Sequence, residues 1–159
     1  MTTVVAETRT ARSTVAPDLF DQLVERITAD RRVGKDHAEQ VMDQALLFLH
    51  ACAANPEAAL VPSRAIDPGW HAFLLHTRAY AQFCRTYAGG FIHHQPEDPH
   101  GGPIGLTEQA ATHLRTLDAI ERTGYVVVPE LWTLDSAKCS KCSASGKDCD
   151  ENTETQLPS

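Results

Sequence analysis

The sequence predicts an all-α fold, a compact bundle of about four helices with a short extended segment and a disordered Cys-rich tail. Three observations predict it. Apolar residues recur at helical spacing in several stretches that end at Gly or Asn-Pro. The length of 159 residues and the 42% hydrophobic content are typical of a single globular domain. From residue 135 onward the apolar residues nearly vanish.

These observations divide the chain into three regions. We expect a flexible N-terminal arm at residues 1–16, a helical domain at 17–134 and a flexible Cys-rich tail at 135–159. Ser, Lys, Gly, Asp and Glu dominate the tail, and such a composition buries too little apolar surface to order a chain by itself.

Two helices are expected first. Pro17-Asp18 opens an apolar period that Gly34 interrupts, and a second period runs from about Asp36 to Ala54. The short break between them predicts an antiparallel helical hairpin. The expected apolar positions are Leu19, Phe20, Leu23, Val24 and Ile27, then Val41, Met42, Ala45, Leu46, Phe48, Leu49 and Cys52.

A third helix should begin at Asp67-Pro68, because Asp is a favoured N-cap and Pro is favoured at the first helical position. We expect one continuous helix from Pro68 to about Ala88, ended by Gly89-Gly90. Its expected buried face holds Trp70, Phe73, Leu74, Thr77, Ala81 and Cys84. Residues 91–94 should then be extended.

The fourth expected helix spans residues 107–122, and its expected core positions are Ala110, Leu114, Leu117 and Ile120. Gly124 ends it. The apolar run from Tyr125 to Trp132 is interrupted by Pro129, so we expect an extended segment that packs back on the helices rather than a strand.

Charge and hydropathy exclude several classes of partner. The net charge of -7 argues against a nucleic-acid binder, which needs a basic stripe. No run approaches the roughly 18 apolar residues of a membrane span, and the first residues lack the apolar core of a secretory signal. We therefore expect a cytoplasmic protein without nucleic-acid or membrane partners. Five cysteines, an odd number, argue against a fully paired secreted framework.

The strongest functional signal is a histidine cluster that runs from Trp70-His71 to His93-His94, in a chain with eight histidines. His71 and His76 are five residues apart, which places them about 140° apart around a helix, on different faces. Asp67 lies four residues before His71 and is expected to be a ligand, to orient the His71 ring, or only to cap the helix.

Neighbouring side chains of an extended segment point to opposite faces, so at most one of His93 and His94 should face the same site. The expected constellation is His71 or His76, with Asp67, plus one of the His93-His94 pair. Two imidazoles and a carboxylate suit Zn²⁺ or non-haem Fe²⁺. The alternative is that these histidines only pack or cap. The remaining histidines are expected to be surface or packing residues: His37, His50, His100 and His113.

The tail contains a C-x-x-C pair, Cys139 and Cys142, followed by Cys149. Three thiolates are one ligand short of a tetrahedral structural site, and the fourth is expected from a histidine of the helical domain, from Asp150 or from another chain. Alternatives are a functionless reduced tail, a redox switch between the paired cysteines, and a tail that is modified as a peptide precursor. Cys52 and Cys84 lie on apolar helix faces and are expected to be small buried hydrophobes.

Part of the sequence resembles a known group. The motif Asp67-Pro68-Gly69-Trp70-His71, with His76-Thr77, Tyr80, Phe83-Cys84 and Gly90-Phe91-Ile92-His93-His94, resembles bacterial relatives of the glycine-rich domain-containing protein family. Gly124-Tyr125, Pro129-Glu130-Leu131-Trp132 and the Cys-rich tail are also similar. The resemblance spans roughly residues 17–149 and implies no established enzymatic activity. This chain departs from the group in lacking a long glycine-rich region and in the wide spacing of its third tail cysteine.

The sequence therefore predicts a small cytosolic metal-binding protein with a His-rich Zn or Fe site and a Cys-rich tail. One alternative is an enzyme that depends on a non-haem metal. Another is a metal-free interaction module, or a precursor whose tail engages a protein partner or a modifying enzyme. The candidate ligands are His71, His76, His93, His94, Asp67, Cys139, Cys142 and Cys149.

Overall fold

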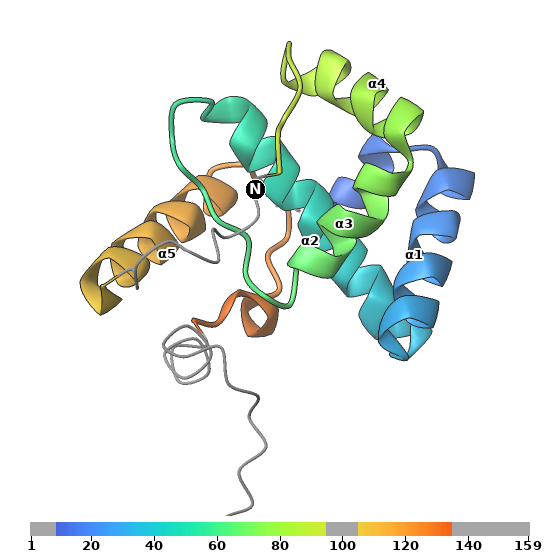
Figure 1. Cartoon of the computed structure of the whole chain (residues 1–159), viewed down its shortest axis with the longest axis horizontal. Helices are drawn as coiled ribbons and strands as arrows, with labels where there is room; N and C mark the ends of the chain where they lie inside the picture. The colour runs from blue at the N-terminus through green and yellow to red at the C-terminus, as the bar shows by residue number, and fades with distance from the viewer. Residues whose placement is uncertain (1–8, 95–104, 135–159) are drawn as a thin grey trace, which may run out of the picture.

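A computed structural model describes residues 9–94 and 105–134, and within these ranges it is all-α with no strand. Five α-helices and two 3₁₀-helices follow one another along the chain (Figure 1). Their bounds are η1 Ala11–Thr14, α1 Pro17–Arg31, α2 Lys35–Ala54, α3 Asp67–Leu75, α4 Thr77–Tyr87, α5 Leu106–Glu121 and η2 Pro129–Trp132. The predicted fold class is confirmed, whereas the tail lies outside the described residues.

Helix α2 is the centre of the bundle. It contacts α1, α3, α4, α5 and η1, and it runs through the middle of the molecule in Figure 1. A helix that is apolar on most sides must be covered on most sides. Its buried positions are Ala38, Val41, Met42, Gln44, Ala45, Leu46, Leu47, Phe48, Leu49 and Ala51.

The predicted hairpin of α1 and α2 is confirmed. Arg32 adopts a left-handed conformation at the C-cap of α1, with φ of 53°, and Gly34 is the N-cap of α2. Both helices begin and end within a few residues of the predicted positions, because Pro17 and Gly34 are helix-start residues that lie where the two helices begin.

Residues 9–16, predicted to belong to a flexible N-terminal arm, pack against the helical domain. Ala11 is fully buried, and the backbone N–H of Arg12 donates to Asp43 on α2 at 2.8 Å. The backbone N–H of Val126 donates to the carbonyl of Arg9 at 3.0 Å. One turn of 3₁₀-helix with a single small apolar residue is too short to show an apolar period, so the sequence pattern does not predict it.

The single helix predicted from residue 68 to 88 is wrong, because the structure divides it at His76 into α3 and α4. His76 leaves the helical region, with φ of -86° and ψ of 61°. No Gly or Pro marks the break. The bend instead brings Tyr80 and Phe83 of α4 edge-on against the Phe73 ring of α3, with centroids 5.2 Å and 5.5 Å apart. Thr77, an expected core position, is exposed as a result.

The segment after α5 packs back on the helices as predicted. Residues 125–128 contain no helix or strand, and η2 completes the return. Leu131 and Trp132 are buried there. On α5 one predicted core position is wrong, since Leu114 is 65% exposed and the buried positions are Thr116, Ala119 and Ile120.

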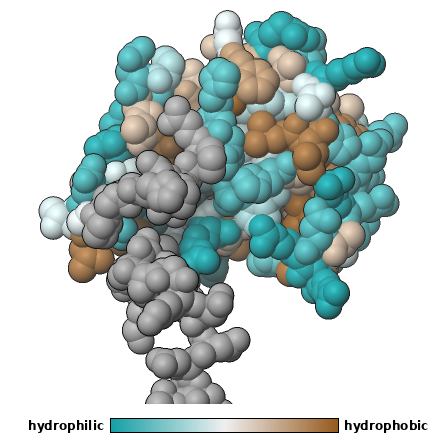
Figure 2. Space-filling model, in the orientation of Figure 1, coloured by the Kyte–Doolittle hydropathy of each residue, from teal (hydrophilic) through white to brown (hydrophobic). Residues whose placement is uncertain are grey.

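The outer surface is mixed. Figure 2 shows a face on which hydrophilic side chains predominate and hydrophobic patches lie between them. Within the described ranges, no helix combines the length and the apolar character needed to span a bilayer.

Candidate metal centre

The first turn of α3 lies unusually close to α2. A Cβ atom at Gly69 would come within 2.7 Å of the Ala45 Cβ and 3.1 Å of the Val41 carbonyl oxygen, so no larger residue fits without displacing a helix. This close approach fixes the position of α3, and with it the side chains of Asp67 and His71, which lie four residues apart on one face.

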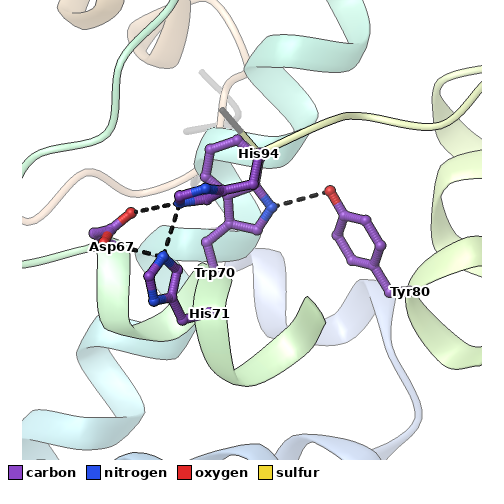
Figure 3. A network of polar contacts seen from close by, with 5 residues as sticks. All are labelled: Asp67, Trp70, His71, Tyr80 and His94. Atoms are coloured by element: carbon purple, nitrogen blue, oxygen red, sulfur yellow. Dashed lines mark hydrogen bonds and ion pairs between the residues drawn. The ribbon is translucent and has the colours of Figure 1, made fainter. Parts of the chain in front are cut away.

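Asp67 does not act as the predicted N-cap. Ile66 occupies the N-cap position, Asp67 is the first helical residue, and no side-chain capping bond forms. The carboxylate instead faces two imidazoles (Figure 3), with Oδ2 lying 3.4 Å from Nε2 of His71 and Oδ1 lying 3.0 Å from Nε2 of His94.

His94 reaches this site from the segment Phe91–His94, which we call the strap. The strap follows α4 and returns across the bundle to the start of α3 (Figure 1). The His94 ring packs edge-on against Trp70, with centroids 4.4 Å apart. Its side chain is 16% exposed, compared with 50% for His71, so the cluster is sheltered on the strap side and open on the α3 side.

The three polar side chains of Asp67, His71 and His94 form a cluster that hydrogen bonds alone do not satisfy. The Nε2 atoms of His71 and His94 are 2.9 Å apart, so protons on both would place two donors against each other. The Asp67 carboxylate only accepts. A single proton on one Nε2 atom leaves at least one of the three close contacts between two lone pairs. Such convergence of lone pairs is the arrangement that a bound cation satisfies.

The spacing of the polar atoms also suits a transition-metal ion. In a tetrahedral zinc site with bonds of about 2.0–2.1 Å, neighbouring donor atoms lie roughly 3.3 Å apart. Here the two Nε2 atoms are 2.9 Å apart, Oδ1 of Asp67 lies 3.0 Å from the His94 nitrogen, and Oδ2 lies 3.4 Å from the His71 nitrogen. One ligand atom from each of the three side chains lies within 4.8 Å of the other two.

The structure brings together three of the predicted site residues and leaves two elsewhere. Asp67, His71 and His94 meet. His76 lies at the bend between α3 and α4, outside the cluster. The His93 ring packs against Phe91, with centroids 4.9 Å apart, so the alternation expected of the extended strap separates it from His94. The predicted ligands Cys139, Cys142 and Cys149 lie outside the described residues.

His50 is a packing residue, as predicted. Its ring contacts the rings of Phe83, Tyr87 and Tyr125 at centroid distances of 5.1, 4.6 and 5.3 Å. Its Nε2 atom is buried without a hydrogen-bond partner. Burial, with a smaller contribution from the charge of Arg9, lowers the pKa of His50 to about 4, which keeps the imidazole neutral.

The two cysteines of the helical domain have the apolar environments that were predicted. Cys84 is buried, and Cys52 is partly buried against the core. Burial raises the pKa of the Cys52 thiol to about 12, so it is a poor nucleophile and a poor metal ligand at neutral pH.

The contacts of the Tyr80 hydroxyl could not be predicted from the sequence. Tyr80 is fully buried, and its oxygen lies 2.9 Å from Nε1 of Trp70 and 2.6 Å from the carbonyl of Ile92 in the strap. These contacts depend on the bend at His76, and no residue type in the sequence marks that bend.

The chain was also compared with known proteins. Residues 10–117 match the sequence pattern of the UCP032817-like family. No curated protein and no solved structure matches the chain. The family match covers α1 to α4, the strap and most of α5, and it therefore includes all three residues of the cluster. The chain belongs to the UCP032817-like family.

Proposed function

We propose that the protein binds one divalent transition-metal ion through Asp67, His71 and His94, with Zn²⁺ as the first choice and Fe²⁺ as the second. The observation that supports this function is the convergence of two imidazole nitrogens and both oxygens of one carboxylate, with contacts of 2.9 to 3.4 Å that a single proton cannot join. Imidazole ligands favour these metals over Mg²⁺ and Ca²⁺, which prefer oxygen.

Three protein ligands leave at least one coordination position for water, a substrate or a further ligand. The half-exposed His71 side chain leaves the cluster open on the α3 side, which favours access from solvent. Bound at such a site, a metal ion supplies Lewis acidity or, for iron, redox chemistry. The alternative function is accordingly a metal-dependent enzyme, and oxygen-dependent turnover by the iron-loaded protein would favour it.

We also propose a role for the tail. A thiolate from Cys139, Cys142 or Cys149 would complete a tetrahedral zinc site, or the three would form a separate site. These residues lie outside the described ranges, so the proposal rests on the C-x-x-C spacing in the sequence. Replacing all three cysteines with Ser should then lower the zinc affinity of the full chain. An unchanged affinity would contradict a metal-binding tail and favour the alternative, in which the tail binds a protein partner or a modifying enzyme.

The cellular setting and the resemblance to glycine-rich domain-containing proteins are further proposals. A cytosolic location would keep the five cysteines reduced and available to metals. The resemblance rests on a motif that contains Asp67, His71 and His94, the three residues that meet in the cluster.

The metal proposal is tested on the full chain, purified with a thiol reductant. Chelator-treated protein is titrated with Zn²⁺, and with Co²⁺ to obtain the visible ligand-field spectrum, and its affinity is compared with those of His71→Ala and His94→Ala. We expect each substitution to weaken binding roughly 100-fold, because each removes a ligand. Fe²⁺ is tested in the same way without oxygen.

Matched controls are available beside each ligand. His93→Ala alters the neighbouring strap residue, and His76→Ala alters the other histidine of the predicted α3 pair, and both should bind metal like the wild type. Failure of the wild-type protein to bind any of the three metals, or equal losses in the ligand variants and the controls, would contradict the proposed site.

A further inference from the structure

We infer that Tyr80 is a positioning residue for the proposed metal centre. Its hydroxyl group holds the strap in the register that presents His94, rather than His93, to Asp67 and His71. The inference rests on the proposed function, because it concerns the affinity of that site. It adds a residue that binds no metal and that lies on α4, outside the helix α3 and the strap that carry the three ligands.

The Tyr80 hydroxyl links Trp70 to the strap by accepting one hydrogen bond and donating another. It accepts from the indole N–H of Trp70 at 2.9 Å and donates to the backbone carbonyl of Ile92 at 2.6 Å. The Tyr80 side chain is fully buried, and burial raises its pKa above the usual value, so the hydroxyl keeps the proton that it donates. The bond to Ile92 is therefore fixed in direction and shielded from water.

Ile92 is the strap residue whose position decides which histidine faces α3. Successive side chains of an extended segment alternate between its two faces, so a slip of one residue would exchange His94 for His93. The structure shows the two histidines with different neighbours, His94 against Trp70 and His93 against Phe91. A hydrogen bond to the main chain of Ile92, two residues before His94, anchors this register.

Trp70 connects the anchor to the metal ligands. Its indole N–H donates to Tyr80, and its ring packs against the His94 imidazole (Figure 3). Trp70 also immediately precedes His71 on α3. In one continuous helix, residues 70 and 80 would lie about 15 Å apart along the axis. The bend at His76 is what allows the two side chains to meet, and this gives the broken helix a role in the site.

The chain offers a matched control for removal of this hydroxyl. Tyr87 lies on the same helix, and its hydroxyl also donates to a backbone carbonyl, that of Thr14, at 3.3 Å. Tyr87 is 41% exposed, and within the described part of the chain its ring packs against His50 and Phe83 rather than against the strap or the three ligands. Tyr87→Phe therefore removes a comparable group from α4 and leaves the strap alone.

The test compares Tyr80→Phe with Tyr87→Phe in the full chain, well below the melting temperature of each variant. Zn²⁺ and Co²⁺ affinities are measured first, and we expect a loss of roughly 10- to 100-fold for Tyr80→Phe, typical of groups that orient a ligand from outside the coordination shell. Tyr87→Phe should bind like the wild type. In a His94→Ala background, Tyr80→Phe should cause no further loss, since there is no His94 to position.

A second measurement needs no metal. In metal-free protein the Trp70 ring lies against His94, so its ring current should displace the NMR signals of the His94 ring protons. In Tyr80→Phe these signals should move toward their values in an unfolded chain, whereas Tyr87→Phe should leave them in place. This readout reports the position of His94 and is insensitive to a uniform loss of stability.

The outcomes separate the two proposals. A lower melting temperature for Tyr80→Phe with unchanged metal affinity and unchanged His94 signals would overturn the positioning role. A wild-type protein that binds none of the metals would overturn the proposed function, and with it the effect of Tyr80 on affinity. The His94 signals would still decide whether Tyr80 positions the strap.

Discussion

Two polar regions of this protein contrast in how their hydrogen-bonding groups are satisfied. Gln44 is completely buried in α2, and each end of its amide has partners of the opposite type. Its Nε2 donates to the carbonyl of Val126 at 2.8 Å, and its Oε1 accepts from the N–H of Val128 at 3.0 Å and from Nε1 of Trp132 at 2.9 Å. In the cluster of Asp67, His71 and His94, by contrast, no single proton can join all three contacts.

The difference separates a structural polar group from a candidate binding site. A buried amide with donors facing acceptors is complete, and it holds the C-terminal segment against α2 without any ligand. The two imidazoles and the carboxylate converge near the surface in a way that one proton cannot join, and the proposed cation would complete them. Polar residues alone do not identify a candidate site, whereas the convergence of several such groups does.

Removing the hydrogen bonds of the Gln44 amide should strongly lower the stability of the folded protein. Gln44→Leu removes both ends of the amide. It leaves the buried indole N–H of Trp132 and two partly buried backbone groups without partners, so we expect a loss of roughly 3–5 kcal/mol in the free energy of unfolding. Urea denaturation measures it. Gln40→Leu, at an exposed position of the same helix, is the control. A loss below about 1 kcal/mol for Gln44→Leu would contradict the structural role of the network.

Breaking the incomplete cluster should change metal binding more than stability. Asp67→Asn keeps the size of the side chain but removes its charge, and we expect zinc affinity to fall about tenfold, since a neutral amide is a weaker ligand than a carboxylate. The melting temperature of the metal-free protein should hardly change. Asp18→Asn alters the first turn of α1 in the same way and is the control. Comparable affinity losses in the two variants would indicate a general charge effect.

His50 is a third polar group, and it has neither a complete set of hydrogen-bond partners nor converging ligand atoms. Its pKa is about 4 in the folded protein and about 6.5 in the unfolded chain. Above pH 6.5 both states hold a neutral imidazole, and the folded state is not penalised. As the pH falls from 6.5 toward 4, the unfolded state takes up the proton first, so stability decreases.

We expect this histidine to account for roughly 1 kcal/mol of acid sensitivity, since partial solvent exposure of the ring reduces the full effect of the pKa shift. His50→Phe should flatten the dependence of the melting temperature on pH across this window and should leave zinc affinity unchanged. His37→Gln, at an exposed position of α2, should keep the wild-type pH dependence. An equal pH dependence in wild type and His50→Phe would argue against the buried neutral imidazole.

The features that depend on local chemistry could be predicted from the sequence. The starts of three helices are marked in the sequence by Pro17, Gly34 and Asp67-Pro68. Apolar periodicity identified α1, α2 and α5. Strand alternation also predicted that His93 and His94 would separate, and helical spacing that Asp67 and His71 would share a face. These rules need only neighbours in sequence.

The features that depend on contacts between residues distant in sequence could not be predicted and are visible only in the tertiary structure. The bend at His76 is formed by packing of Phe73 against Tyr80 and Phe83, and no Gly or Pro marks it. The burial of Ala11 and the exposure of Leu114 depend on which surfaces α2 covers. Selection of His94 depends on a hydrogen bond between Tyr80 and Ile92, which are twelve residues apart. A periodic pattern shows which face of an element is apolar, but only the assembled bundle shows what that face meets.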